Sequence, residues 1–60
     1  MIIYISKRKG EWWKVKDYLL DYNEIVLQNQ KEETIIIDEK YLERYYFQEI
    51  IDEEEWKVIE

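Results

Sequence analysis

The sequence has no cysteine, histidine, proline or alanine, and it has only one glycine among 60 residues. Without cysteine, neither a disulfide nor a thiolate zinc site can stabilise the domain. Without histidine, the chain lacks both the commonest metal ligand and the commonest general base. A single glycine also excludes a glycine-rich phosphate-binding loop. Stability must therefore come from burial of apolar side chains or from self-association.

The remaining reactive groups argue against an enzyme. Ser6 and Thr34 are the only serine and the only threonine, and neither can have a histidine or cysteine partner. A pair of carboxylates needs a buried cleft to separate its two pKa values, and a domain of this size has little room for one. The acids of residues 49–55 lack the spacing and the glycine of a calcium loop. We therefore expect a non-enzymatic protein with no catalytic, cofactor or metal site.

We expect residues 1–60 to form a single small domain in the cytoplasm. No apolar run is long enough to span a membrane. The charges of residues 7–9 follow the first apolar residues, which is the reverse of a secretory signal. Amino acids with AT-rich codons (Phe, Tyr, Met, Ile, Asn and Lys) supply 27 of the 60 residues. This bias favours an AT-rich genome, such as that of a bacterium, an archaeon or one of their viruses; a viral protein would act inside an infected host cell.

Charge is distributed unevenly along the chain. Residues 1–31 carry a net charge of +2 and residues 32–60 carry −8, which together give −6. A net negative charge argues against general affinity for the nucleic-acid backbone, and it permits binding to a basic partner. The densest clusters of opposite charge are residues 7–9 and residues 52–55. We expect these two clusters to be electrostatically complementary, within one chain or between two copies.

The apolar pattern predicts a mainly β fold organised around a hairpin. Residues 25–27 and 34–37 are short runs rich in β-branched side chains. The polar residues 28–33 between them have the length of a hairpin loop. We expect both runs to be strands, and we expect Ile36 to lie in the core.

Two further strands are predicted before this hairpin. Residues 2–6 form the first, and the second runs from residue 11 to about residue 20. Gly10, in the turn between them, is expected at a positive φ. Alternation along the second strand puts Trp13 in the core and Trp12 on a basic face.

Residues 38–51 allow two interpretations. Asp38 is a good N-cap, and a helix could run from it to residue 51, which would give an α+β fold. The tyrosine, phenylalanine and isoleucine side chains after residue 44 instead favour a strand. We prefer one short helical turn near residues 38–43 followed by a strand. Residues 52–55 are an acidic break or a helix start, and Trp56 then indicates a docked tail or a short final strand.

The hairpin, the segment DEKYLE (residues 38–43) and the following strand together resemble the last third of an SH3-like barrel, over residues 24–50. The resemblance implies a small barrel or a strongly bent antiparallel sheet, with Tyr41 as the aromatic residue of the turn and Leu42 buried. Peptide-binding SH3 domains usually have a proline in this turn, which is absent here. The resemblance therefore implies a barrel topology and not recognition of proline-rich peptides.

Apolar residues are too numerous for the interior of such a fold. They number 28, ten of them aromatic, and only about half of the strand positions point inward. Clustered exposed tyrosine and tryptophan typify contact surfaces, although such side chains could instead cover the barrel ends. The predicted binding residues are these aromatics and the basic turn: Trp12, Tyr18, Tyr22, Tyr45, Tyr46, Lys7, Arg8 and Lys9.

Three functions fit these observations. The first is a protein-interaction module, as a homodimer or as a small virus-encoded or accessory inhibitor, acting through an aromatic face rimmed by acidic residues. The second is an acidic nucleic-acid mimic that binds a DNA-binding protein. The third is a single-stranded nucleic-acid binder that stacks bases on Trp12 beside the loop formed by Lys7, Arg8 and Lys9. We favour the first function because it requires only the apolar surplus.

Overall fold

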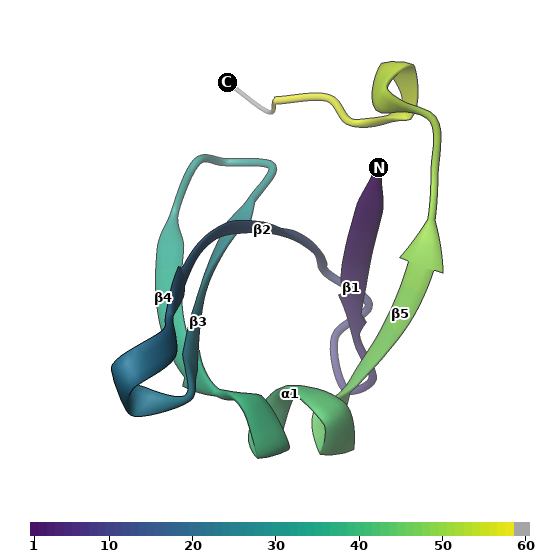
Figure 1. The fold of residues 1–60 in the computed structure, drawn as a ribbon. Coiled ribbons are helices and arrows are strands. Elements are labelled where there is room, and N and C mark those ends of the chain that lie inside the picture. Colours follow the sequence, from purple (N-terminus) through teal and green to yellow (C-terminus); the bar gives the residue numbers. More distant parts are fainter. Residues whose placement is uncertain (59–60) are drawn as a thin grey trace.

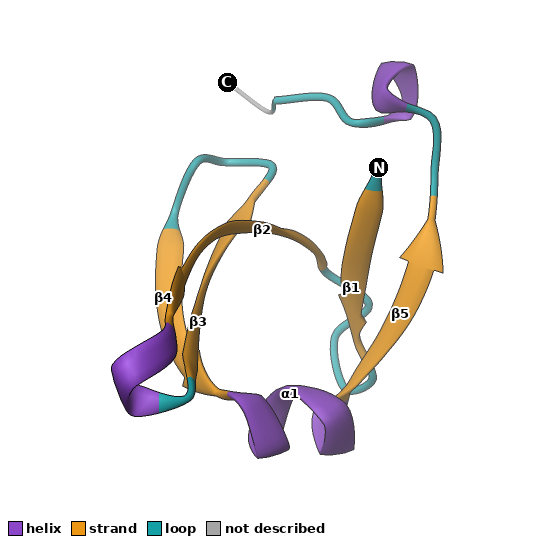
Figure 2. Ribbon diagram, viewed as in Figure 1, coloured by secondary structure: helices purple, strands orange, loops and turns teal. Residues whose placement is uncertain are grey.

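A computed structural model describes residues 1–58, which form one bent antiparallel sheet and a short helix (Figure 1, Figure 2). The five strands lie in the order β4-β3-β2-β1-β5. The prediction of a mainly β fold is therefore confirmed. The elements are β1 (Ile2–Ser6), β2 (Trp12–Leu19), η1 (Leu20–Tyr22, a 3₁₀ helix), β3 (Glu24–Asn29), β4 (Thr34–Asp38), α1 (Glu39–Tyr45), β5 (Tyr46–Ile50) and η2 (Glu53–Glu55, also 3₁₀).

The sheet is strongly bent but not closed. β2 curves across the molecule from β3 to β1 (Figure 1). Its register against β3 shifts between Val15 and Asp17, so Lys16 is the extra residue of a bulge, a feature that bends and twists a strand. β4 and β5 are the two unpaired edges, and α1 connects them across the open side. This arrangement confirms the prediction of a strongly bent antiparallel sheet.

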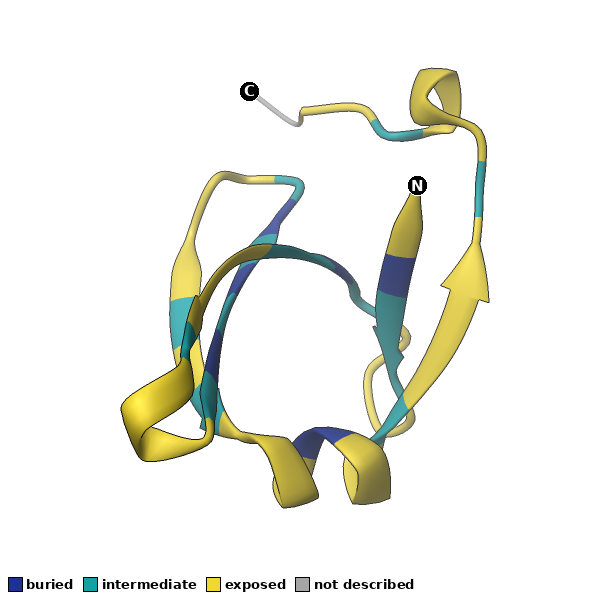
Figure 3. Cartoon of the chain, in the orientation of Figure 1, coloured by how far each residue is buried: buried dark blue, intermediate teal, exposed yellow. Residues whose placement is uncertain are grey.

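The main core lies on the concave face of the sheet. Trp13 is 7% exposed, as expected for a core residue, and it is clustered with three other buried side chains, Ile25, Leu27 and Leu42. Figure 3 shows buried positions in dark blue on the strands and on α1. The cluster combines β2, β3 and α1, so the helix closes the open side of the sheet over the core. Half-buried apolar side chains surround it: Tyr4, Val15, Ile35, Ile37 and Tyr46.

The prediction that Ile36 lies in the core is wrong, because its side chain is 58% exposed. Ile36 pairs with Val26 on the outer face of the sheet. Its neighbours Ile35 and Ile37 point to the other face and pack against the core. A strand shows its residues alternately to two faces, so a run of three isoleucines can place either one or two of them inside.

A helix followed by a strand forms after β4, as preferred. Asp38 is the N-cap, and its Oδ1 accepts a hydrogen bond from the Lys40 N–H at 2.8 Å. Leu42 is buried at 3% exposure, as expected. The helix ends where Tyr46 adopts an extended backbone. The alternative of one helix over residues 38–51 is therefore wrong, and α1 ends two residues later than the expected turn.

The tail packs against the outer face and forms no strand within residues 51–58. Asp52 and Glu55 form a capping box around η2. Trp56 is half-buried, and the Lys14 ammonium lies 5.3 Å from its ring centroid. Ile3 pairs with Lys14 on this face and is 0% exposed, although it is not part of the main core cluster. The docked tail is thus the correct alternative; Ile59 lies outside the described residues.

The basic turn and the acidic residues of the tail lie at opposite ends of β1. β5 runs antiparallel to β1, so Ile51 lies beside Met1, and its N–H donates to the Met1 carbonyl at 2.9 Å. Residues 52–55 follow at this end, whereas residues 7–9 follow the other end of β1 (Figure 1). The prediction that the two clusters are complementary within one chain is therefore wrong. Contact between two chains stays a prediction.

Candidate functional site

A cleft of about 740 Å³ opens between β4, the C-terminal half of α1 and the turn that joins β1 to β2. We call it the aromatic cleft. It lies on the side where the sheet remains unclosed, so its walls come from segments far apart in the sequence. Its lining residues are Ser6, Arg8, Lys9, Glu11, Trp13, Asn29, Glu33, Thr34, Ile35, Tyr41, Tyr45 and Tyr46.

Three tyrosines supply the accessible apolar surface of the aromatic cleft. Tyr41 and Tyr45 are four residues apart in α1, which puts them on one face of the helix, and their ring centroids are 4.5 Å apart. Tyr46 lies next to them, with its ring centroid 6.5 Å from that of Tyr41. Tyr41 is 50% exposed and Tyr45 is 43% exposed. Both rings can therefore contact a partner without any rearrangement of the core.

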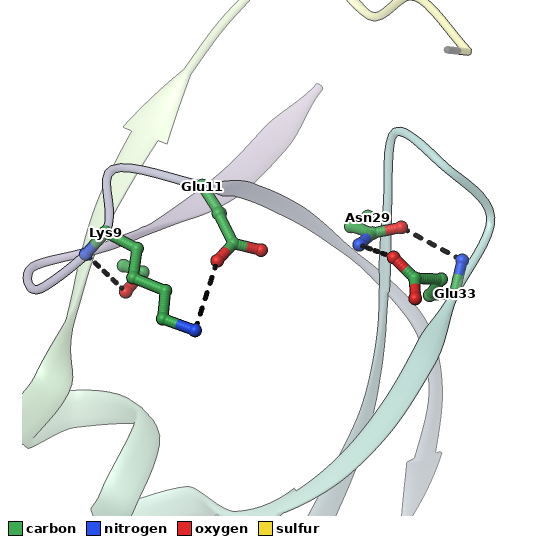
Figure 4. Close-up of polar contacts among 5 residues, drawn as sticks. Lys9, Glu11, Asn29 and Glu33 are labelled. Carbon is green, nitrogen blue, oxygen red and sulfur yellow. Dashed lines mark hydrogen bonds and ion pairs between the residues drawn. The ribbon is translucent and has the colours of Figure 1, made fainter. Parts of the chain in front are cut away.

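The β3–β4 hairpin forms one polar side of the cleft (Figure 4). Asn29 is 8% exposed, and its Oδ1 accepts hydrogen bonds from the N–H groups of Lys31 at 3.0 Å and Glu33 at 2.9 Å. Its Nδ2 donates to Oε1 of Glu33 at 3.0 Å. The side chain thereby replaces backbone pairing inside the loop. These bonds hold the Glu33 carboxylate at the rim.

The turn after β1 forms the other polar side (Figure 4). Gly10 has φ +70°, as expected, and its N–H donates to the Ser6 carbonyl at 2.7 Å. The Lys9 N–H donates to Oγ of Ser6 at 3.2 Å. The Lys9 ammonium and the Glu11 carboxylate are 4.0 Å apart, and both side chains are exposed. Such a pair contributes only about 0–1 kcal/mol, so a partner could separate it at little cost.

Burial raises the pKa of two phenols near the core above the ordinary value. For Tyr46, which lines the cleft, the neighbouring Tyr41 and Glu11 add to the effect of burial. For Tyr4, burial is again the main cause, followed by Tyr18 and Glu39. Both hydroxyl groups therefore stay neutral at pH 7 and can donate hydrogen bonds.

No metal site or membrane-crossing helix is found within residues 1–58. Three or more potential ligand side chains do not come together anywhere in this part of the chain. Its helices are also too short and too polar to cross a membrane.

The structure brings only some of the predicted binding residues together. Arg8, Lys9, Tyr45 and Tyr46 all line the aromatic cleft. Tyr18 lines a second cavity of about 410 Å³, together with Tyr4, Glu39 and Tyr46 among others. Tyr22 is 72% exposed on η1 and lines neither of these cavities.

Trp12 and Lys7 belong to the outer face of the sheet. Ile5 pairs with Trp12 on one side and with Phe47 on the other, which makes a row across β2, β1 and β5. The Lys7 ammonium lies 5.0 Å from the Phe47 ring centroid and donates a hydrogen bond to the Arg44 carbonyl at 2.9 Å. This row carries an aromatic residue at each end and a cation beside one of them.

Tyr41, Asn29 and Glu33 belong to the cleft but were not among the predicted binding residues. The spacing of Tyr41 and Tyr45 is a signal that could have identified the first, once Asp38 was recognised as a helix N-cap. Asn29 and Glu33 carry no such signal, because their role depends on the path of the loop.

Comparisons with protein-family models, with curated proteins and with solved structures found no match to this chain.

Proposed function

We propose that the chain is a non-enzymatic protein-interaction module whose aromatic cleft takes up apolar side chains of a partner protein. The observation that carries this proposal is the accessibility of Tyr41 and Tyr45 inside a cleft of about 740 Å³. Binding pockets commonly measure about 300–1,000 Å³. Tyrosine is enriched at interfaces because it offers a large contact area with only two flexible torsions. A chain this small would act by occupying the surface of a larger protein, as an accessory or virus-encoded inhibitor does.

The rim of the cleft supports this proposal and refines the chemistry of the partner. Arg8 and Lys9 lie on one side, and Glu33 lies on the other, with Glu11 beside Lys9. An apolar centre within a polar rim is the usual anatomy of a protein interface. Because the rim carries both signs of charge, we expect an aromatic or aliphatic anchor flanked by an acidic and a basic residue on the partner.

The absence of histidine, the commonest general base, supports a binding role for the hydroxyl groups of the cleft. Ser6 and Thr34 both line it. A serine or threonine nucleophile needs a neighbouring base to remove its proton, and the sequence has no histidine. The Ser6 hydroxyl instead accepts a hydrogen bond from the Lys9 N–H, which orders the turn.

Affinity capture from the native host, followed by titration of the captured protein, tests the proposal. Wild type and Tyr22→Ala should retain the same protein, because Tyr22 is exposed outside the cleft. Tyr45→Ala should lose it, since truncating a central interface aromatic commonly costs about 2 kcal/mol or more. Retention that is equal for all three proteins would contradict a binding role for the cleft.

We also propose that the fold is of the SH3-like kind. In support, β4 leads through α1 into β5, and β5 pairs with β1 at the far side of the sheet. Tyr41 lies in the connecting helix, and Leu42 beside it is buried, as the resemblance implies. An experimental structure with strand pairing different from this order would remove that support.

A second candidate function is binding of single-stranded nucleic acid on the outer face. The row of Trp12, Ile5 and Phe47 beside Lys7 favours it, because bases stack on aromatic rings near cations. The net charge of −6 opposes it. A gel shift with single-stranded oligonucleotides at low salt should be weakened by Phe47→Ala and not by Tyr22→Ala if this function is real. No such arrangement favours a nucleic-acid mimic, because the acids of residues 32–55 belong to a loop, β4, α1, β5 and η2.

Finally, we propose that the chain forms a homodimer. Its open sheet leaves β4 and β5 as unpaired edges, and edges of this kind pair readily with other strands. Large apolar side chains are exposed on both, including Ile36 on β4 and Ile50 on β5. Sedimentation at micromolar concentration should therefore give twice the chain mass of 7.7 kDa. A single species of one chain mass would contradict the dimer.

A further inference from the structure

β4 is an edge strand without the features that usually prevent edges from pairing. Natural edges are protected by proline, lysine, inward-pointing charges, β-bulges or a covering segment. β4 has the sequence TIIID, and its pairing with β3 runs without a register shift. Its middle residue, Ile36, is 58% exposed. Such a strand is a template for another extended segment.

We infer that this edge pairs with β4 of a second copy of the chain, antiparallel and around a two-fold axis at Ile36. The inference rests on the proposed homodimer and specifies its surface. Ile36 would lie opposite the partner's Ile36, and Ile35 opposite the partner's Ile37. Thr34 would lie opposite the partner's Asp38, whose carboxylate can accept a hydrogen bond from the Thr34 hydroxyl. Every side chain of β4 therefore faces a compatible side chain of the second copy.

The pairing adds apolar contacts on both faces of the sheet. On the outer face, Ile36 already pairs with half-buried Val26, so each copy contributes two apolar side chains to one continuous row. A groove of about 490 Å³ runs along β4 beside Tyr41, and inner-face residues Ile35 and Ile37 belong to its lining. Ile35 and Ile37 of the second copy point into this face and fill the groove. The second copy thus covers surface that a monomer leaves in water.

No other register uses the whole strand. An axis at Ile35 would place Asp38 opposite the partner's Glu32, and two like charges facing each other are destabilising. An axis at Ile37 would place Ile36 opposite the partner's Asp38 and would run the pairing into α1. An axis between two residues would put the inner face of one copy beside the outer face of the other. The sequence of β4 therefore selects the axis at Ile36.

The second edge is less suited to self-pairing, and salt distinguishes the two kinds of contact. β5 carries Glu49 within the strand and leads into the acidic η2. The net charge of −6 makes two copies repel each other, so a β4 dimer should tighten when salt screens this repulsion. A dimer held by the basic turn of one copy and the acidic tail of the other should loosen with salt.

Sedimentation equilibrium across the micromolar range tests the surface. Wild type should approach twice the chain mass of 7.7 kDa. Ile36→Lys should raise the dissociation constant by about tenfold or more, because each copy then places a charge at a position that the dimer contact would otherwise bury as isoleucine. Leu20→Lys is the matched control: Leu20 is 81% exposed on η1, away from β4, and it should leave the dissociation constant unchanged.

Disulfide cross-linking gives a second readout that does not depend on weakening the dimer. The wild-type chain has no cysteine, so each single-cysteine variant has one reactive thiol. Facing residues of antiparallel strands have Cα atoms about 4.5–5.5 Å apart, a separation that a disulfide spans. Ile36→Cys should therefore give a covalent dimer rapidly under mild oxidation. Leu20→Cys should react far more slowly, through random collision only.

Each outcome decides a different point. A wild-type protein that stays at one chain mass overturns both the homodimer and the β4 pairing. A dimer that tolerates Ile36→Lys and is not cross-linked through Ile36→Cys overturns the β4 pairing alone. The Ile36 substitutions leave the lining of the aromatic cleft unchanged, because Ile36 is not part of it, although Tyr41 lines both the cleft and the groove along β4.

Discussion

Asn29 and Glu33 hold the β3–β4 hairpin closed through three hydrogen bonds to each other. The Asn29 side chain accepts from the Glu33 N–H at 2.9 Å and donates to the Glu33 carboxylate at 3.0 Å, and the Asn29 N–H donates to the Glu33 carbonyl at 3.0 Å. Asn29 is 8% exposed, so water cannot easily replace these bonds. The same contact sets the shape of the loop and the position of a carboxylate at the rim of the aromatic cleft.

Replacing Asn29 should therefore lower the free energy of unfolding by more than is usual for a residue of a surface hairpin. Asn29→Ala leaves the N–H groups of Lys31 and Glu33 without their acceptor. We expect a loss of about 1–3 kcal/mol in the free energy of unfolding, measured by urea denaturation. Gln30→Ala changes a neighbouring amide of the same loop and is the control. Equal losses in the two variants would show that the side-chain bonds contribute nothing.

Two leucines of very different burial give the second prediction. Leu42, on the buried face of α1, is 3% exposed, whereas Leu20 is 81% exposed on η1. Leu42→Ala should cost about 2–5 kcal/mol, because it leaves a cavity in the core. The total stability of so small a domain is about 3–5 kcal/mol, so this variant should be largely unfolded. Leu20→Ala should change the unfolding free energy by less than about 0.5 kcal/mol. Similar circular dichroism melting curves for the two variants would contradict the position of the core.

Local sequence signals predicted much of the fold because the responsible physics is local. Gly10 at a positive φ and Asp38 as an N-cap each depend on a few neighbouring residues. Trp13 and Leu42 were also expected in the core, from alternation and from the resemblance. Ile36 was misplaced because an unbroken run of isoleucines contains no alternation that shows which side faces inward.

The candidate site was harder to predict because it depends on contacts between distant segments. The bulge at Lys16 reverses the alternation of β2, so Trp12 and Tyr18 lie on opposite faces and not on one binding surface. Pairing of β5 with β1 decides that the acidic tail lies far from the basic turn. Neither the bulge nor this long-range pairing leaves a mark in the local sequence.

Alkaline pH should destabilise the fold through the two phenols of raised pKa. A phenol whose pKa is higher in the folded state than its unfolded value of about 10 stabilises the fold below pH 10, and this contribution is lost as pH rises further. Burial is the main cause of the shift for both Tyr4 and Tyr46. The double variant Tyr4→Phe/Tyr46→Phe should lose less stability than wild type between neutral and strongly alkaline pH. Urea midpoints measured across this range, with Tyr22→Phe as the control, check the prediction. A double variant as alkali-sensitive as wild type would contradict it.

Glu32 is a position where substitution by glycine should stabilise the fold. Its φ is +65°, a conformation that costs an L-residue about 1–2 kcal/mol. Glycine adopts it freely but loses more entropy on folding, by about 0.5–1 kcal/mol. Glu32→Gly should therefore raise the free energy of unfolding by roughly 0.5–1 kcal/mol. Gln30→Gly, in the same loop without a positive φ, should lower it. The prediction fails if both glycine variants are less stable than wild type.

The contact between Lys14 and Trp56 should hold the tail over Ile3. The ammonium lies 5.3 Å from the ring centroid, and a cation–π contact at a partly exposed site contributes about 0.5–1 kcal/mol. Trp56→Ala should lower the free energy of unfolding more than Lys14→Met, roughly by 1–3 kcal/mol, because we expect the half-buried indole beside Lys14 also to cover Ile3, the residue that pairs with Lys14.

A double-mutant cycle of these two substitutions separates the direct contact from the covering of Ile3. The coupling energy measured by urea denaturation should be about 0.5–1 kcal/mol, since each single variant already removes the contact. Lys57→Met changes a neighbouring cation of the tail and should show no coupling to Trp56→Ala. Hydrogen exchange at the Ile3 amide should also accelerate in Trp56→Ala. A tail that is docked by other contacts would give zero coupling and unchanged exchange.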